Sequence, residues 1–474
     1  MSQIKDLKGD EIDDLDVGNM KEKEFKKKSK KEEKINYTAN FNGLVDIVND
    51  DGQARFLTVE GELLDKIEID NKIYYPPSKL GWFLPRASEV LNEVKKHDTL
   101  DTSASQQGCT YCQSYIYPYT FDYFKQFSDP PTDLHRHYLV WMDFHSYLIE
   151  KFNFSPILFL VATKDRGKTP TLKAMAYSCY RGKYTETFRE PNLIRWSSDY
   201  NASMFFDVKD FPKKVELANC EDLIFGRAER GVIASRVLFP EKGAFNDMVD
   251  FEVFGVTGAT SNVMVDSITE ARCIVFNMPL SKRVFDMEPS REMGLEVREK
   301  LTAFRMAHLR TPFVDIKKEK IGKLENYLKG YHQMIKTIFP KYEDEFIKFK
   351  ELMEKQKKEE AEGTFEGKLL LSIVNLKDNV ENGTLFLSTE DITNEFNKNR
   401  PERYHVSTDT IGSDLKALGF KMKRNSLSTK RGIFFDTDLI NTLGDQFNID
   451  TKALKVDPLQ QSGVSDEDIE GVFG

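Results

Sequence analysis

Cysteine is scarce in this sequence, and long apolar runs are missing. The cysteines form an odd and scattered set, which argues against a disulfide-stapled scaffold and favours a reducing cytosol: Cys109, Cys112, Cys179, Cys220 and Cys273. No apolar run approaches the length of a membrane-spanning helix, and Met1–Asp16 lacks the apolar segment of a signal peptide. We therefore expect a cytoplasmic protein with no membrane partner.

An excess of positive charge is missing as well. The formal net charge is −9, so the chain as a whole is not a basic coat for nucleic acid, and any such binding must come from local patches. Hydrophobic residues make up 40% of the 474 residues, which is enough for two or three domains that each bury a core.

Shifts in composition and pattern divide the chain into segments. These are a charged tail (1–35), an N-terminal β/α module (36–145), a central α/β domain (146–310), a helical lid or linker (311–362), a C-terminal domain (363–450) and an acidic tail (451–474). Both tails are poor in large apolar side chains, so we expect them to be disordered. The acidic tail has two alternative interpretations, a partner-binding peptide and a mimic of DNA.

The strongest motif lies in Ser155–Ala176, which reads SPILFLVATKDRGKTPTLKAMA. Pro156–Ala162 is a short apolar run, the pattern of a strand buried on both faces of a parallel sheet, and Thr171–Tyr180 has the apolar spacing of a helix. Strand, tight loop and helix together predict a phosphate-binding P-loop, where backbone N–H groups and the helix dipole converge on an anion. The predicted nucleotide-binding residues are Ala162, Thr163, Lys164, Asp165, Arg166, Gly167, Lys168 and Thr169.

Two side chains of this loop have specific predicted tasks. Lys168 is expected to reach the β- and γ-phosphates and the Thr169 hydroxyl to hold Mg²⁺, so ATP and Mg²⁺ are the predicted cofactors. Pro170 fits the first helical turn, where a missing N–H has no partner to lose. Ala162 departs from the motif, which has Gly at this position, and its methyl group requires a negative φ.

A second Mg²⁺ contact is expected at the end of another strand. Ser203–Phe206 is apolar and Asp207 follows it, which is where a P-loop ATPase places an acidic residue. The glutamate that often comes next, and polarises the attacking water, is replaced by Val208. Either Asp210 acts from the next turn, or the base lies elsewhere, or hydrolysis is slow.

Two further predicted strands carry candidates for catalysis. Gly255–Asn262 ends in Asn262, whose amide is suited to orient the γ-phosphate or the lytic water. Cys273–Met278 follows Arg272, whose guanidinium is suited to stabilise charge on a phosphoryl group across a subunit boundary. The alternative for Arg272 is an ordinary ion pair with Glu270.

Ala234–Phe254 is predicted to form two strands around a turn, with Lys242 at its tip. Lys242 is either a contact to the phosphate backbone of DNA or an ordinary charged residue of a surface turn.

The C-terminal domain is predicted to be a winged helix-turn-helix. Its expected elements are helices at Lys368–Leu376, Thr389–Lys398 (capped by Ser388) and Thr408–Leu418 (capped by Ser407), and a hairpin of Phe420–Arg424 and Gly432–Asp436. Residues 398–431 hold nine Lys/Arg against three Asp/Glu, which suits phosphate contacts and groove readout. The candidate DNA-binding residues are Lys416, Lys421, Lys423, Arg424, Lys430 and Arg431, together with Lys242. The alternative is a winged helix that docks a protein.

Cys109 and Cys112 form a lone CxxC pair. A zinc site needs two more ligands, for which the nearest candidates are His135 and His137, and no second cysteine pair exists. The sequence therefore favours ordinary buried thiols over a metal site.

Leu44–Leu309 resembles the AAA+ and superfamily-3-like P-loop ATPases of the primase–helicase replication cassettes of plasmids, phages and integrated elements. The resemblance is carried by SPILFLVATKDRGKTPTLKAMAYSCYRGKY, MFFDVKD, SRVLFPEKGAFND, FEVFGVTGATSN and ARCIVFNMP. It implies an α/β P-loop fold and a hexameric ring with ATP between subunits. It also implies roles for individual residues: Lys168 and Thr169 as Walker A pair, Asp207 as Walker B acid, Asn262 as sensor 1, Arg272 as arginine finger and Lys242 as pore contact.

The resulting functional prediction is a DNA-acting ATPase of a mobile element or phage, a hexameric replicative helicase or origin-remodelling motor with a primase or other replication protein as a partner. One alternative is a nucleotide-gated DNA-binding regulator with weak or no unwinding, which the substitution at Val208 favours. A third class is a defence or scaffolding ATPase whose winged helix docks a protein.

Overall fold

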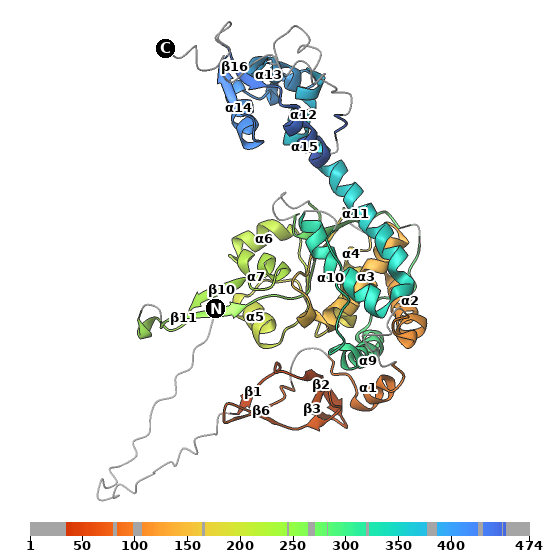
Figure 1. Cartoon of the computed structure of the whole chain (residues 1–474). Helices are drawn as coiled ribbons and strands as arrows, with labels where there is room; N and C mark the ends of the chain where they lie inside the picture. Colours follow the sequence, from red (N-terminus) through yellow and green to blue (C-terminus); the bar gives the residue numbers. More distant parts are fainter. Residues whose placement is uncertain are drawn as a thin grey trace, which may run out of the picture.

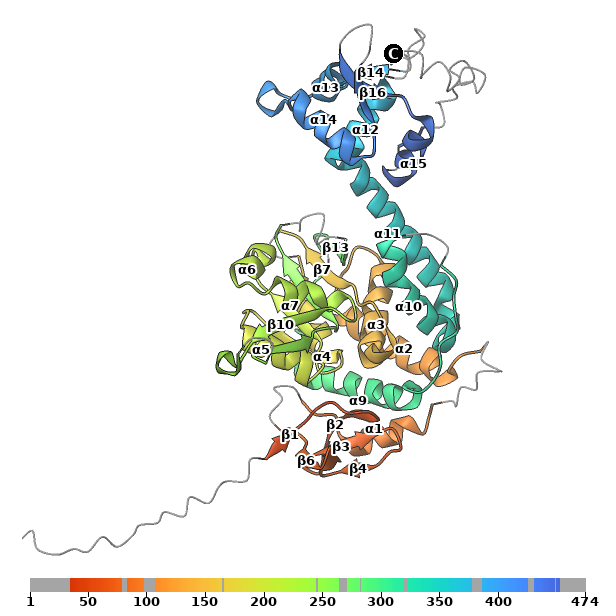
Figure 2. The same ribbon diagram turned by 60° about the vertical axis from the view of Figure 1, so that its left-hand side comes forward.

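The computed structural model describes residues 35–78, 83–97, 107–163, 166–243, 246–263, 271–281, 283–318, 322–376, 386–424, 430–447 and 449–451. The two predicted tails lie almost entirely outside the described residues. The described chain forms a small β-rich module, a large central α/β body and a C-terminal unit that the long helix α11 (Glu343–Gly363) joins to the body (Figures 1 and 2).

Two small sheets form the N-terminal module. They are ordered β2-β3-β4 and β1-β6-β5, with β1 at Asn36–Tyr37, β2 at Leu44–Asp50, β3 at Gln53–Thr58, β4 at Leu63–Leu64, β5 at Ile67–Ile69 and β6 at Lys72–Tyr75. Asp51 and Gly52 link β2 to β3 with φ of 47° and 89°, the left-handed pair that a two-residue hairpin favours. β2, β3 and β4 pair antiparallel, as do β5 and β6, whereas β1 pairs in parallel with β6.

Helices follow this module, and one of them is far more buried than its sequence indicates. They are α1 (Ala87–Val94), the π-helix η1 (Cys112–Ile116), α2 (Tyr117–Phe127), α3 (Asp133–Tyr147) and the short η2 (Ile149–Lys151). Every residue from Tyr138 to Tyr147 is buried, because α3 packs among α2, α4, α9, α10 and α11. The apolar pattern of Leu134–Phe152 is that of an amphipathic helix, but α3 has no solvated face over its last ten residues.

A five-stranded parallel sheet lies at the centre of the molecule. Its order is β13-β7-β12-β9-β8, with β7 at Ile157–Val161, β8 at Lys183–Thr185, β9 at Met204–Asp207, β12 at Thr257–Ser261 and β13 at Cys273–Asn277. Each neighbouring pair is parallel, which confirms the predicted α/β class with a parallel sheet. Because β12 lies between β7 and β9, the residues that follow these three strands meet at one edge of the sheet.

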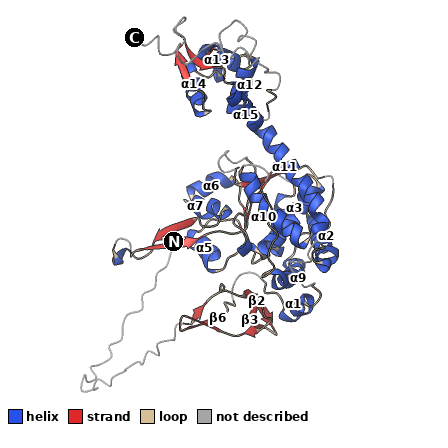
Figure 3. Cartoon of the chain, in the orientation of Figure 1, coloured by secondary structure: helices blue, strands red, loops and turns tan. Residues whose placement is uncertain are grey.

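Short elements surround the sheet, and a hairpin leaves it. They are α4 (Lys168–Ser178), α5 (Glu190–Ile194), η3 (Arg195–Asp199), α6 (Phe211–Leu217), α7 (Glu221–Phe225), η4 (Gly226–Ala228), β10 (Ile233–Val237), η5 (Pro240–Lys242) and β11 (Met248–Glu252). β10 and β11 pair antiparallel and project from the side of the body, the feature drawn in red at the left of Figure 3. The two strands expected in Ala234–Phe254 are confirmed.

Long helices complete the central body. They are α9 (Arg291–His308), α10 (Lys323–Ile338), the short η6 (Pro340–Tyr342) and the first half of α11. One apolar cluster runs from Cys109 to Met353 and includes α2, α3, the sheet, α9, α10 and α11. The boundary expected at 145/146 lies inside this cluster, because α3 packs on the sheet and on α10 and α11. α9 lies between the body and the N-terminal module in Figure 2, and its buried Arg305 donates to the backbone carbonyls of Leu44 and Val45.

The C-terminal unit has its own apolar cluster. Its elements are α12 (Phe365–Asn375), β14 (Phe386–Ser388), α13 (Thr389–Asn397), η8 (Glu402–Tyr404), α14 (Thr408–Ala417), β15 (Met422–Arg424), β16 (Arg431–Phe434) and α15 (Thr437–Phe447). The two predicted caps are confirmed: Ser388 accepts a hydrogen bond from the Asp391 N–H and Ser407 from the Thr410 N–H. β15 and β16 form the expected hairpin, β14 adds a third strand, and residues 425–429 lie outside the described part.

Among the described residues, no helix combines the length and the apolar character that crossing a bilayer requires.

Candidate active site

The P-loop sequence lies between β7 and α4. All five residues of β7 are buried between β12 and β13, as its continuous apolar run predicts. Gly167 has φ of 70° and caps α4, which begins at Lys168, three residues before the predicted start. Pro170 stands in the first turn as expected, and Ala162 is not among the residues with positive φ. Lys164 and Asp165 lie outside the described residues.

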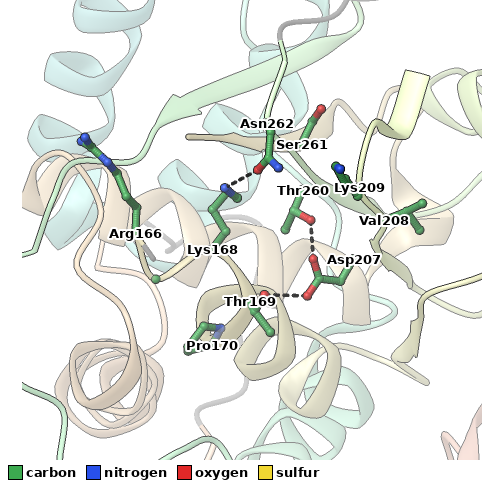
Figure 4. Close-up of a pocket in the computed structure, with 11 residues that line it drawn as sticks. Arg166, Lys168, Thr169, Pro170, Asp207, Val208, Lys209, Thr260, Ser261 and Asn262 are labelled. Atoms are coloured by element: carbon green, nitrogen blue, oxygen red, sulfur yellow. Dashed lines mark hydrogen bonds between the residues drawn. The ribbon is translucent and has the colours of Figure 1, made fainter. Parts of the chain in front are cut away.

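The Lys168 ammonium lies over the loop, beside the end of β12. Its Nζ donates to the Ala162 carbonyl at 2.5 Å, to the Thr163 carbonyl at 2.8 Å and to Asn262 Oδ1 at 2.9 Å. The sheet order explains the last contact, since Asn262 follows β12, the immediate neighbour of β7. The structure therefore brings the predicted Walker A lysine and the predicted sensor amide together (Figure 4).

Asp207 ends β9 and faces the first turn of α4. The Thr169 hydroxyl donates to Asp207 Oδ2 at 2.6 Å, and the Thr260 hydroxyl donates to Oδ1 at 2.5 Å (Figure 4). A third hydroxyl, of Tyr184 on β8, donates to Oδ2 at 2.8 Å. Hydroxyl and carboxylate oxygens are the hard ligands that Mg²⁺ prefers, so Thr169 and Asp207 have the chemistry of a shared Mg²⁺ site.

Sequence reasoning missed Tyr184 and Thr260. Burial and the hydrogen bond to Asp207 raise the pKa of Tyr184 well above its ordinary value, so this hydroxyl keeps its proton and remains a donor. A signal for Thr260 existed, since it lies two residues before Asn262 on the same strand. No sequence signal exists for Tyr184, because the strand order that sets β8 beside β9 is not visible in the chain.

A cavity of about 500 Å³ opens between these groups. This volume falls within the range of ligand sites in proteins. Residues from the P-loop and from the ends of β9 and β12 line it: Arg166, Gly167, Lys168, Thr169, Pro170, Asp207, Val208, Lys209, Thr260, Ser261 and Asn262 (Figure 4). Cations, a helix N-terminus, an amide and a carboxylate thus face one polar space at the carboxyl edge of a parallel sheet, an arrangement suited to a polyphosphate with its metal.

The residues after Asp207 do not supply a second acid to the cavity. Val208 is buried and packs in the apolar cluster of β9 and α6. Asp210 caps α6 in a left-handed conformation, with φ of 55°, and is not among the residues that line the cavity.

Arg272 lies at the amino ends of the parallel strands, opposite the carboxyl ends where Lys168 lies. It immediately precedes β13, and its carbonyl accepts a hydrogen bond from the Ile157 N–H at the start of β7. Five strand residues, about 17 Å at 3.3 Å per residue, separate this edge from the carboxyl edge that carries Lys168. Arg272 is thus remote from the site of its own chain, and Glu270, its alternative partner, lies outside the described residues.

Lys242 lies in η5 at the tip of the hairpin, and its Nζ is 3.7 Å from the ring centroid of Phe239. Apolar side chains along the hairpin are exposed, among them Ile233, Val237 and Met248. A projecting hairpin with exposed apolar residues is a surface that a macromolecular partner can cover.

The candidate DNA-binding side chains of the C-terminal unit are all exposed. A groove of about 540 Å³ is lined by Lys416, Lys430 and Arg431, but also by Glu390 and Asp409. Lys430 Nζ is 3.1 Å from Glu390 Oε2, so part of its charge is already compensated. Lys421, Lys423 and Arg424 lie outside this groove, on and before β15.

The histidines expected beside the CxxC pair lie elsewhere. His135 Nδ1 is 2.8 Å from the Thr132 hydroxyl, and His137 Nδ1 is 2.8 Å from the Tyr117 hydroxyl. Their proposal as ligands is wrong, because α3 directs them to other partners. All five cysteines are buried, and none forms a disulfide.

Comparisons with known proteins find only solved structures of low similarity. No protein-family model and no curated protein matches the sequence. Two solved structures of the NrS-1 C-terminal region align at 12% and 10% identity over 78% of this chain and 82% of that one, with TM-scores of 0.31 and 0.34. The SCCmec type IV Cch protein, described as an active helicase, aligns at 10% identity over 82% of this chain and 79% of that one, with a TM-score of 0.33. Similarity at this level does not indicate a function.

Proposed function

We propose that this chain is a P-loop ATPase that acts on DNA, most specifically a hexameric replicative helicase or origin-remodelling motor of a mobile element or phage. The observation that carries the proposal is the 2.6 Å hydrogen bond from the Thr169 hydroxyl to the Asp207 carboxylate, inside the cavity beside Lys168. Segments far apart in the chain meet there, and their lysine, hydroxyl and carboxylate groups suit an Mg²⁺–nucleotide complex.

Each group of the cavity has a task in phosphoryl transfer. The amides at the start of α4 and the Lys168 ammonium bind the phosphates, and Thr169 and Asp207 hold the Mg²⁺ that neutralises developing charge. Thr260 and Tyr184 act as positioning residues, because each donates a hydrogen bond that fixes the Asp207 carboxylate. Asn262, 2.9 Å from Lys168, is placed to orient the γ-phosphate or the attacking water.

Arg272 links the proposed hydrolysis to the assembly of subunits. An arginine at the amino ends of the strands cannot reach the cavity of its own chain. In an oligomer, however, the Arg272 of one subunit can reach the cavity of its neighbour. Hydrolysis then depends on oligomerisation, and the exposed hairpin of β10 and β11 offers a surface for a neighbour or for DNA. The ring size of six rests on the family resemblance alone.

The C-terminal unit is proposed to be the winged helix that binds DNA. Helices α12, α13 and α14 followed by the β15–β16 hairpin support this, and Lys421, Lys423 and Arg424 extend a basic edge along the wing. The carboxylates of Glu390 and Asp409 beside Lys416 favour phosphate contacts by the wing rather than by the groove.

The test is turnover and strand displacement on forked DNA. Lys168→Ala should abolish DNA-stimulated ATP hydrolysis and unwinding, whereas Lys214→Ala, an exposed lysine of α6 outside the cavity, should leave both unchanged. Unchanged turnover in Lys168→Ala would remove the proposed site.

A nucleotide-gated DNA-binding regulator is the second candidate, favoured by the buried Val208 where a catalytic acid is usual. It predicts ATP-dependent assembly on DNA without strand displacement in the same assay.

A further inference from the structure

Two cysteines and two histidines from three separate parts of the chain come together near the ends of α1 and α9. His97 follows α1, Cys109 lies three residues before η1, Cys112 begins η1, and His308 ends α9. The four ligand atoms, which are His97 Nδ1, the two Sγ atoms and His308 Nε2, all lie within 4.8 Å of one another. Of these residues the CxxC pair was visible in the sequence, but the histidines lie 12 residues before it and 196 residues after it.

The spacing of these atoms is that of a tetrahedral metal site. Zinc lies about 2.3 Å from sulfur and about 2.0–2.1 Å from nitrogen, so tetrahedral ligands are about 3.4 Å apart for N and N and about 3.6 Å apart for S and N. The two imidazole nitrogens are 3.4 Å apart, and Cys112 Sγ is 3.3 Å from each of them. Cys109 Sγ is 3.9 Å from His97 Nδ1. A hydrogen-bonded cluster alone has no reason to hold all four atoms around one point.

Hydrogen bonds and close packing hold the backbone around Cys109 and Cys112 in place. The Cys112 N–H donates to Cys109 Sγ at 3.4 Å, the contact that stabilises a sulfur carrying negative charge. The Cys109 N–H donates to the Ile338 carbonyl at 3.0 Å. Gly108 has φ of 62°, and a Cβ there would lie 2.3 Å from Pro340 Cδ and 2.6 Å from the Ile338 oxygen, so the chain before Cys109 is pressed against the end of α10.

The cluster is closed to solvent on most sides. Cys109, Cys112 and His308 are fully buried and His97 is partly buried. Four ligands in an enclosed pocket characterise a structural zinc site, whereas a catalytic site keeps one position for water or substrate. Thiolate and imidazole ligands select zinc over the hard ions Mg²⁺ and Ca²⁺.

We propose that His97, Cys109, Cys112 and His308 bind one structural Zn²⁺ ion. Binding displaces the protons of the two thiols, and the two thiolates then balance the charge of the metal. The ion ties the end of α1, a helix that contacts β2 of the N-terminal module, to η1 and to the end of α9 in the central body. It therefore helps to hold the module on the central body.

Metal content of the purified full-length protein tests the proposal. After expression in zinc-supplemented medium and dialysis against a weak chelator, elemental analysis should give about one zinc per chain. Cys112→Ser and His308→Ala should each lose most of the zinc, whereas Cys220→Ser, which alters another buried thiol outside the cluster, should keep it. Cobalt(II) exchanged into the wild-type protein should give the intense d–d bands of tetrahedral thiolate coordination.

The wild-type measurements decide the matter even where a variant fails to fold. Zinc far below one per chain, together with no tetrahedral cobalt spectrum, would overturn the proposal. A Cys109–Cys112 disulfide in protein purified without reductant would contradict it as well, and so would full zinc content in Cys112→Ser.

Discussion

Replacing Asp207 by asparagine separates the metal-binding role of this side chain from its structural role. The amide has nearly the same shape and still offers an oxygen to the hydroxyls that Asp207 now binds, those of Thr169, Tyr184 and Thr260. The substitution removes one negative charge from the proposed Mg²⁺ site. Two unit charges 4 Å apart near a protein surface attract by about 4 kcal/mol, whereas one altered hydrogen bond is worth about 1 kcal/mol. The loss of the negative charge should therefore matter more than the altered hydrogen bond.

We therefore expect Asp207→Asn to lower ATP turnover by about 100- to 1000-fold, since about 1.4 kcal/mol corresponds to a factor of ten. Turnover should recover in part as the Mg²⁺ concentration rises. Binding of a fluorescent ATP analogue in EDTA should stay within about twofold of wild type, because the phosphate contacts of Lys168 and the P-loop amides remain.

Asp210→Asn is the matched control for the same change of charge. Asparagine tolerates the left-handed conformation of this position, and Asp210 does not line the cavity, so turnover should stay near wild type. Turnover by Asp207→Asn within a few-fold of wild type at every Mg²⁺ concentration would refute the assigned site. An equally large loss in Asp210→Asn would instead make Asp210 the missing base.

Three further predictions concern assembly, stability and DNA. Mixing Arg272→Ala with Asp207→Ala subunits should restore part of the ATPase activity that each lacks alone, and no recovery at any ratio would count against action across subunits. Burial raises the pKa of Asp143 to about 7 from 3.8, so the folded chain keeps a proton that the unfolded chain loses, and stability falls as pH rises through that window. Thermal melts should then show that the stability of Asp143→Asn relative to wild type increases by about 1.4 kcal/mol per pH unit between about pH 4 and 7. A stability difference that does not change with pH would refute the neutral carboxyl. Lys423→Ala should weaken duplex binding and lower the salt slope of log K by about one, whereas an unaltered slope would place DNA elsewhere.

The core of the candidate site followed from the sequence because it depends on local rules. A doubly buried strand, a loop and a helix predict their own order, and the carboxyl ends of parallel strands share one edge. Those two rules place Asp207 and Asn262 at the end of the sheet that carries Lys168 and Thr169, and the strand order then sets which of them touch. The caps at Ser388 and Ser407 were equally local, since a single side chain satisfies a nearby N–H.

What escaped prediction depends on the order of strands and on distant packing. Tyr184 reaches Asp207 only because β8 is the edge strand next to β9. The pattern of α3 indicated an amphipathic helix, but α2, α4, α9, α10 and α11 pack around it and leave residues such as Asp143 and His145 buried. His97 and His308 stand 211 residues apart and meet only after α9 folds against α1.

The long helix α11 links the C-terminal unit to the central body. Phe346, Phe349 and Met353 anchor its first half in the body, while its far half contacts α12 and α15. At 1.5 Å per residue, 21 residues make a rod of about 31 Å, roughly the length of one turn of duplex DNA. Under the proposed function, a force on the C-terminal unit would pass through this helix to the central body. Two glycines introduced after Met353 would make the helix more flexible and weaken that coupling.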